Sequence, residues 1–292
     1  MKLTITGSST ALFSTWYLVE EFQLLFDAGD GVISNLLQRS RKAQHVFVSH
    51  ADRDHMSSLM AFRQMHARPE GFPKIYYPKD ARSFEYLKDF SARFAPHSPP
   101  TPWYGVDDGQ EFAIKPNYIV KSIRNEHIDV PLPVIKSVGY EILEVKRKLK
   151  TAFKGLSGLE IKALREKKGN DFITQEQRQS ILTYTGDTPV RDYDLWSQAN
   201  VLIHEATFLE APAKNKRGSV HSVLEEVIDM VAQSQVQQLI LGHFSMRYSK
   251  QEIEQAVQQL CQQYQLHIPV FCVLPGVVAR DILSTPPTYQ PS

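Results

Sequence analysis

The sequence is poor in cysteine and contains no long hydrophobic run. Cys261 and Cys272 are the only two cysteines among 292 residues, which excludes a disulfide framework and a cysteine-based zinc ribbon. No segment approaches the roughly 20 apolar residues that cross a bilayer, and the amino terminus lacks the apolar core of a signal peptide. We therefore expect a soluble, cytoplasmic protein that has no membrane partner.

The net charge is also small, at +1, but the charges are unevenly distributed. Between Lys146 and Lys168 the chain carries nine basic residues and two acidic ones. A positive segment on an otherwise acidic chain attracts a polyanion. The alternative interpretation is a solvated helix face without a ligand.

The apolar residues that are present, 42% of the chain, suffice for a large α/β core. We expect one domain over 1–292, with a basic insertion around 146–180 as a possible substrate-binding arm. Apolar runs predict strands over 3–6, 17–26, 45–48, 118–123, 139–145, 181–184, 201–203 and 239–241. Helical spacing predicts helices over 32–39, 55–66 and 79–94. Ser222 with Glu225, and Ser249 with Glu252, fit the capping box that starts a helix.

One short stretch concentrates side chains that can bind a metal. His50, Asp52, Asp54 and His55 fall within six residues, directly after the apolar run 46–48. A strand that ends at His50 and a helix that begins near Asp54 would bring these side chains together above the strand end. The alternative is a polar turn in which Asp52 or Asp54 caps the helix.

The same pattern recurs along the chain. Five predicted strands end in a potential metal ligand or acid–base group, namely His50, His127, Asp187, His204–Glu205 and His243. Strand ends along one edge of a sheet are where α/β proteins place their sites. We therefore expect these residues to share one site.

The number of donors fits a site for two metal ions, which needs about seven protein donors and a carboxylate able to bridge the ions. We assign His50, Asp52 and His127 to one ion, Asp54, His55 and His243 to the other, and Asp187 to the bridge.

The order and context of these motifs resemble the metallo-β-lactamase superfamily and, within it, ribonuclease Z, the tRNA 3′-processing endonuclease. Beyond the ligands, the resemblance is carried by the segments 25–31, 137–140, 184–188, 204–208 and 243–248. It implies an αββα sandwich, two divalent metal ions (zinc foremost, manganese possible), and hydrolysis of a phosphodiester by a hydroxide shared between the ions. It also implies a homodimer.

The resemblance further implies roles for individual residues. Asp54 would orient the attacking water or take its proton. His221 would donate a proton to the leaving 3′-oxygen, with Glu205 holding its imidazole. The expected substrate contacts are Ser245, Arg247, Lys146, Arg147, Lys148 and Lys150.

Three positions depart from the family pattern. Asp52 stands where histidine is usual, so we expect weaker attraction for phosphate and greater tolerance of manganese, because carboxylate oxygen suits harder cations. The segment between Tyr140 and Ile181 is shorter than the family's arm and lacks its Gly-Pro. Val223 replaces a threonine next to the expected acid.

The leading hypothesis is a metal-dependent endoribonuclease that acts on tRNA precursors. A phosphodiesterase acting on cyclic nucleotides or other small phosphodiesters is the first alternative, which the shorter arm favours. A non-catalytic RNA-binding protein with a degenerate metal site is the second, which Asp52 favours. The presence of both His221 and Glu205 argues against the second, since a binding protein needs no acid for a leaving group.

Overall fold

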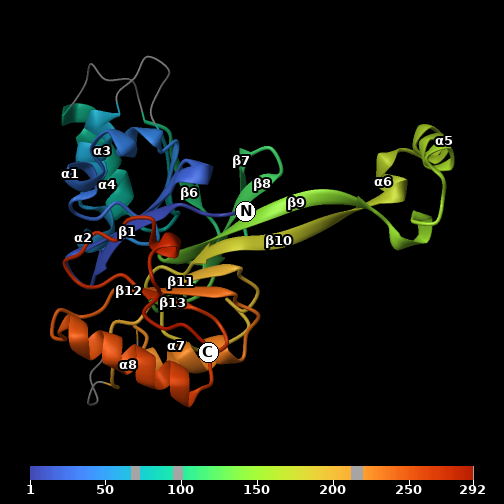
Figure 1. The fold of residues 1–292 in the computed structure, drawn as a ribbon. Coiled ribbons are helices and arrows are strands. Elements are labelled where there is room, and N and C mark those ends of the chain that lie inside the picture. The colour runs from blue at the N-terminus through green and yellow to red at the C-terminus, as the bar shows by residue number, and fades with distance from the viewer. Residues whose placement is uncertain (67–72, 95–100, 212–219, 292) are drawn as a thin grey trace.

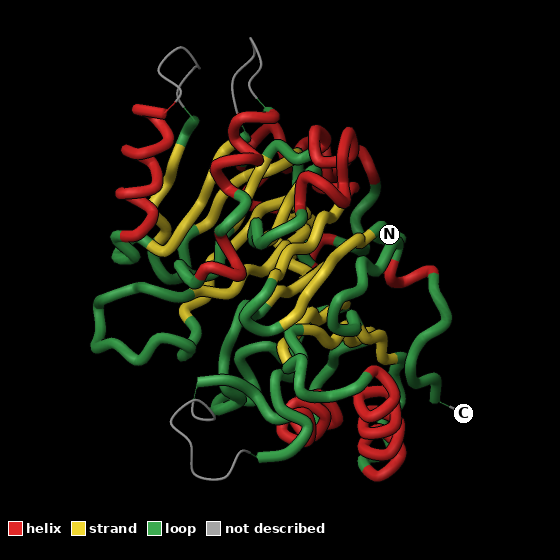
Figure 2. Tube along the Cα trace, turned by 90° about the vertical axis from the view of Figure 1, so that its left-hand side faces the viewer, coloured by secondary structure: helices red, strands yellow, loops and turns green. Residues whose placement is uncertain are grey.

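The computed structural model describes residues 1–66, 73–94, 101–211 and 220–291. Two β-sheets stack face to face, and helices cover the outer face of each sheet (Figures 1 and 2). This architecture confirms the expected αββα sandwich. No helix in these ranges combines the length and the apolar character needed to span a membrane.

The first sheet contains the amino-terminal strands in chain order. It comprises β1 (Ile5–Thr10), β2 (Ser14–Val19), β3 (Leu24–Phe26), β4 (His45–Phe47), β5 (Lys74–Pro78) and β6 (Trp103–Val106). The strands from β1 to β3 pair antiparallel, and those from β3 to β6 pair parallel. Its outer face packs against α1 (Val32–Leu36), α3 (Leu59–Met65) and α4 (Ser83–Phe94), while the short α2 (Arg53–Met56) follows β4.

The second sheet has the spatial order β13-β12-β11-β10-β9-β8-β7. Its strands are β7 (Glu111–Lys115), β8 (Tyr118–Arg124), β9 (Val138–Leu149), β10 (Thr174–Tyr184), β11 (Val201–Glu205), β12 (Gln238–Gly242) and β13 (Val270–Cys272). The outer face is covered by α7 (Leu224–Ala232) and α8 (Lys250–Gln263). Buried α7 residues recur at helical spacing, as expected for a helix with one face on a sheet.

An aromatic cluster joins the inner faces of the two sheets. The Phe47 ring of the first sheet lies 5.1 Å from the Tyr140 ring of the second, and Phe26 lies 5.1 Å from Tyr184. Burial of such rings is a major contribution to core stability. The cluster therefore fixes the relative position of the strand ends on which the site is built.

The basic segment folds into an arm that projects from the body. β9 and β10 continue beyond the sheet as a hairpin, and α5 (Gly158–Lys168) and α6 (Asn170–Ile173) lie at its far end (Figure 1). The Phe153 and Phe172 rings lie 5.6 Å apart in this tip, and the Lys168 ammonium lies 4.3 Å from the centre of the Phe172 ring.

The structure corrects two predicted elements. The predicted strand over 17–26 is two antiparallel strands, β2 and β3, because Gln23 adopts a left-handed conformation with φ of 50° and the chain reverses there. The predicted helix over 55–66 is interrupted between α2 and α3, where the Ser58 amide donates to the Ala28 carbonyl at 2.8 Å.

The two predicted capping boxes have different outcomes. Ser249 and Glu252 form theirs at the start of α8, as predicted. The prediction for Ser222 and Glu225 is wrong, because the Ser222 hydroxyl donates to the Thr188 carbonyl at 2.6 Å and α7 begins at Leu224.

Candidate metal centre and active site

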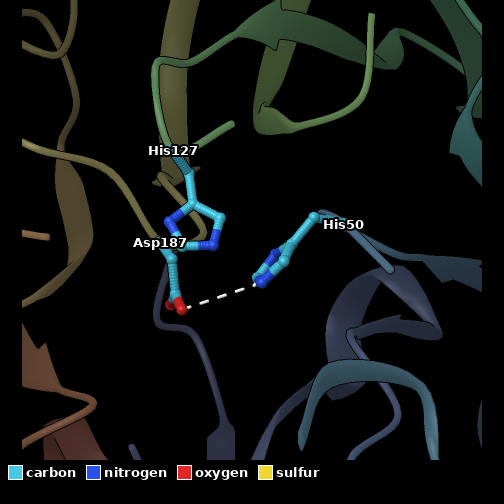
Figure 3. A group of neighbouring side chains, drawn as sticks. All are labelled: His50, His127 and Asp187. Atoms are coloured by element: carbon cyan, nitrogen blue, oxygen red, sulfur yellow. Dashed lines mark ion pairs between the residues drawn. The ribbon is translucent and has the colours of Figure 1, made fainter. Parts of the chain in front are cut away.

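The predicted ligands lie just beyond strand ends that the two sheets bring to one place. His50 follows β4, His127 follows β8, Asp187 follows β10 and His243 follows β12. Figure 3 shows His50, His127 and Asp187 facing a common space, and their ligand atoms all lie within 4.8 Å of one another.

A second group adjoins the first. Ligand atoms of Asp54, His55 and His243 also lie within 4.8 Å of one another. The Asp187 carboxylate lies between the groups, with Oδ2 at 3.7 Å from His50 Nε2 and at 3.3 Å from His55 Nε2. This position is the one that a bridging carboxylate requires.

Asp52 faces the first group. Its Oδ2 lies 3.7 Å from His50 Nε2 and 3.6 Å from His127 Nε2. Asp52 also occupies the N-cap position of α2, but its side chain makes no capping hydrogen bond. Asp52 is therefore the N-cap residue by position, as the turn alternative had it, but its side chain does not cap the helix.

The four histidines predicted as metal ligands each use Nδ1 for a hydrogen bond that holds the ring. The partners are Ser49 Oγ for His50 at 2.9 Å, Asp27 Oδ2 for His55 at 2.7 Å, the Val220 carbonyl for His127 at 3.0 Å, and Thr207 Oγ1 for His243 at 2.9 Å. With Nδ1 holding a proton in each of these bonds, it is Nε2 of each ring that would bind a metal ion. Histidine ligands of metal ions are oriented in this way.

His50 provides a direct test of whether a metal fits. Its Nε2 is buried and has no hydrogen-bond partner within the described ranges. Burial, followed by the neighbouring His55 and His127, holds the pKa of His50 well below its usual value, so the ring is neutral. A buried neutral imidazole with an unused lone pair has the state that a metal ligand needs.

The Asp27 carboxylate holds His55 and Ser49 in position through hydrogen bonds. This buried carboxylate accepts hydrogen bonds from the Ser49 amide at 2.6 Å, the Ser49 hydroxyl at 2.9 Å and the Tyr184 hydroxyl, in addition to His55. The sequence placed Asp27 in a motif but gave it no role. Its function is visible only once strands β3, β4 and β10 are assembled.

The expected acid pair lies beside the two groups. His221 Nδ1 lies 2.9 Å from Glu205 Oε1 and 3.8 Å from Asp187 Oδ2. Burial alone would lower the pKa of His221, but the charge and hydrogen bond of Glu205 raise it to about 9. His221 is therefore protonated at neutral pH, as a general acid must be.

Thr207 links this pair to the predicted metal ligands, and its position in the segment 204–208 did not mark it as a site residue. Its hydroxyl donates to Glu205 Oε2 and accepts from His243 Nδ1 at 2.9 Å. Glu205 consequently orients His221 directly and His243 through Thr207. Glu205 in β11 pairs with Gly242 in β12, and this register places Glu205 close to His243, the next residue after Gly242.

A hollow of about 80 Å³ opens over the second group. Leu12, Phe208, His221, Ser245 and Arg247 are among its lining residues. The Arg247 guanidinium lies 5.3 Å from the centre of the Phe208 ring, and its Nε donates to Ser245 Oγ at 3.1 Å. The two predicted contacts Ser245 and Arg247 thus lie at the site.

Leu12 also contributes to this hollow, although sequence reasoning missed it. Its backbone amide donates to Asp54 Oδ2 at 2.9 Å, and its φ of 69° lies in the left-handed region. A leucine rarely adopts that conformation. The hairpin between β1 and β2 therefore holds Asp54 in place.

The other predicted contacts lie away from the site, along the arm. Lys146 pairs with Glu144 at 2.7 Å, Arg147 pairs with Asp171, and Lys150 donates to the Phe172 carbonyl at 2.8 Å. Neither these residues nor Lys148 line the hollow.

The family model described as a beta-lactamase superfamily domain matches residues 23–244, a range that contains all seven predicted metal ligands. The chain belongs to the β-lactamase superfamily.

Within this superfamily, relatives of similar sequence include proteins named tRNase Z and Ribonuclease Z. The chain is 29% identical over 272 residues to tRNase Z TRZ1 of Arabidopsis thaliana, covering 88% of this chain and 90% of the relative. It is 26% identical over 255 residues to Ribonuclease Z of Bacillus licheniformis, covering 80% and 82%. The resemblance to ribonuclease Z is confirmed.

Solved structures of the superfamily share the fold. Human tRNase Z, short form, superposes with a TM-score of 0.60 at 18% identity, covering 94% of this chain and 98% of that one. The metallo-β-lactamase fold protein YhfI of Bacillus subtilis superposes with a TM-score of 0.62 at 15% identity, covering 96% and 100%.

Proposed function

We propose that this chain is a metal-dependent endoribonuclease that hydrolyses a phosphodiester bond in the 3′ end processing of tRNA precursors. The observation that carries the proposal is the His221–Glu205 pair, placed beside two groups of metal-binding side chains. Relatives named tRNase Z and Ribonuclease Z support the choice of substrate.

His50, Asp52 and His127 would hold one divalent ion, Asp54, His55 and His243 would hold a second, and Asp187 would bridge them. Two such ions activate a water molecule and stabilise charge on the attacked phosphate. Imidazole donors suit zinc, and the carboxylate of Asp52 extends the site to manganese.

The chain's own side chains complete the reaction. Water attacks the phosphorus atom, the bond from phosphorus to the 3′-oxygen breaks, and the downstream product keeps a 5′-phosphate. His221 gives its proton to the leaving 3′-oxygen, and Glu205 stabilises the protonated imidazole until transfer. Asp54, fixed by the Leu12 amide, orients the water or accepts its proton.

The remaining parts of the proposal concern partners. Ser245 and Arg247 would contact the RNA beside the cleaved bond, and the basic arm would contact phosphates farther along the tRNA. By the same resemblance, the enzyme would act as a homodimer. The low cysteine content favours the cytoplasm as its compartment.

One assay tests the function. Purified protein with zinc or manganese is given a precursor tRNA and, in parallel, bis-p-nitrophenyl phosphate. We expect cleavage of both, and a loss of about 100-fold or more on the precursor in His221→Ala, the usual contribution of a positioned acid. Cleavage of the small diester alone would favour the small-phosphodiester alternative, and cleavage of neither would favour a binding protein.

A further inference from the structure

A second and larger hollow begins at the metal-binding side chains. It has a volume of about 1010 Å³, at the upper end of the ~300–1,000 Å³ range of ligand pockets. Asp52 lines both this cleft and the smaller hollow, whereas His221 lines the smaller hollow and not the cleft. The two hollows therefore meet at Asp52 and differ in their access to the acid.

The two walls of the cleft are joined by hydrogen bonds. One wall is the segment 79–86, which leads from β5 into α4, and the other includes Ile128, Val134 and Lys136. The Asp80 amide donates to the Ile135 carbonyl at 3.0 Å, and Asp80 Oδ2 accepts from the Ile135 amide at 2.7 Å. These bonds fix the spacing of the walls, so the cleft is preformed.

The side chains of the cleft are suited to a single-stranded polyanion. Arg82 is exposed and Lys136 half-buried, and neither has a hydrogen-bond or ion-pair partner for its side chain in the part of the chain that the structure describes. Lys79 pairs with Asp107 at 2.5 Å. Three carboxylates also line the cleft: Asp52 at the predicted metal site, Asp80, which accepts from the Ile135 amide, and the exposed Glu85. Tyr86, which lines the same cleft, is 70% exposed. Unpaired cations beside an exposed aromatic ring are the elements with which proteins bind single strands.

We infer that this cleft binds the single-stranded RNA that lies downstream of the cleaved bond, with Tyr86 stacking on a base and Arg82 and Lys136 contacting phosphates. The inference rests on the proposed function. His221 must lie on the side of the leaving 3′-oxygen, which belongs to the upstream nucleotide. The downstream segment, attached through its 5′-phosphate, then leaves the site on the other side of the scissile phosphate, where the cleft opens at Asp52.

The cleft can be tested without catalysis. The probe is a short single-stranded RNA with a 5′-phosphate and a fluorescent 3′ end, titrated with metal-loaded protein and followed by anisotropy. We expect Tyr86→Ala to weaken binding by about tenfold, the usual loss of one stacked base. Arg82→Ala and Lys136→Ala should each weaken binding and reduce its dependence on salt.

Matched controls lie on the same helix. Phe90 is 55% exposed and Lys88 is exposed, and neither lines the cleft. Phe90→Ala and Lys88→Ala should bind the probe like the parent. The inference is overturned if the parent does not bind the probe, or if the cleft variants and the control variants bind it equally well.

A second measurement separates this inference from the proposed function. Precursors with a long and with a single-nucleotide 3′ extension are cleaved by the parent and by Tyr86→Ala. We expect the variant to lose efficiency on the long extension only. If no precursor is cleaved, the proposed function fails, and the oligonucleotide titration still shows whether the cleft binds single-stranded RNA. If Tyr86→Ala loses equal efficiency on both precursors, the cleft does not bind the downstream RNA.

Discussion

At the scale of single residues, the site depends on how the protein sets the protonation of one histidine. Glu205 is buried, and although burial would raise its pKa, His221 lowers it, so the carboxylate stays charged. That charge in turn raises the pKa of His221 to about 9. The pair is thus a buried acid that is ready to donate near neutral pH.

The pH dependence of cleavage should report this pair. His221 is protonated below about pH 9 and loses its proton above it, so the rate should fall as pH rises through about 9. In Glu205→Gln the opposing charge is gone while burial still lowers the pKa, so the falling limb should move to lower pH. Initial rates across pH, with bis-p-nitrophenyl phosphate as a comparison because its leaving group needs little protonation, measure the shift. An unmoved limb would show that His221 is not the acid.

Thr207 should act on metal affinity through His243. Thr207→Val keeps the shape of the side chain but removes the hydroxyl that holds His243 Nδ1. Loss of such a supporting partner typically weakens metal binding by about 10–100-fold. Competition with a chromophoric chelator measures the affinity, and Thr207→Ser, which restores the hydroxyl, is the control. Equal affinity in Thr207→Val and the parent would remove this role.

At the scale of elements, the strand ends were the most predictable part of the chain. The predicted ligands after β4, β8, β10 and β12 could be proposed because short apolar runs stop just before polar residues that can bind a metal. Strands β5, β6, β7 and β13 were not predicted. β5, β6 and β13 are short, and pairing with strands that are distant in the sequence defines them more than local pattern does. β7 pairs only with the adjacent β8 at the edge of the sheet, and none of its residues is buried.

The supporting contacts could not be predicted for a related reason. Asp27, Thr207 and Leu12 act through hydrogen bonds to residues that are distant in the sequence, and those bonds exist only in the folded sheets. The helix α5 at the tip of the arm was not predicted from the sequence, although one of its features is typical of a helix start. Ser157 and Glu160 form a capping box at the start of α5, yet α5 buries no residue, so no apolar face marked the helix.

The arm should contribute to binding of large substrates and not to chemistry. Lys146, Arg147 and Lys148 lie on β9 and Lys150 directly follows it, all outside the hollow. Reversal of these four charges to glutamate should weaken tRNA binding and lower the slope of log affinity against log salt by about one per lost phosphate contact. Filter binding across salt concentrations measures both, and unchanged hydrolysis of bis-p-nitrophenyl phosphate is the control. A variant that binds tRNA as tightly as the parent would exclude the arm from recognition.

At the scale of the whole molecule, the site exists only because both sheets contribute to it. His50, Asp54 and His55 come from the first sheet and the helix that follows β4, whereas His127, Asp187 and His243 follow strands of the second sheet. The aromatic core between the sheets therefore sets the spacing of the two groups. Metal ions held between the sheets should in turn stabilise the sandwich, since a ligand that binds only the folded state raises its stability.

The central claim is that these scattered side chains hold two metal ions around one bridging carboxylate. The most direct measurement is metal content per chain, by elemental analysis after dialysis, in the parent and in His50→Ala, His243→Ala and Asp187→Ala. We expect about two zinc or manganese ions in the parent, about one after loss of His50 or of His243, and weaker retention of both after loss of Asp187. A parent that retains no metal, or variants that retain as much as the parent, would contradict it.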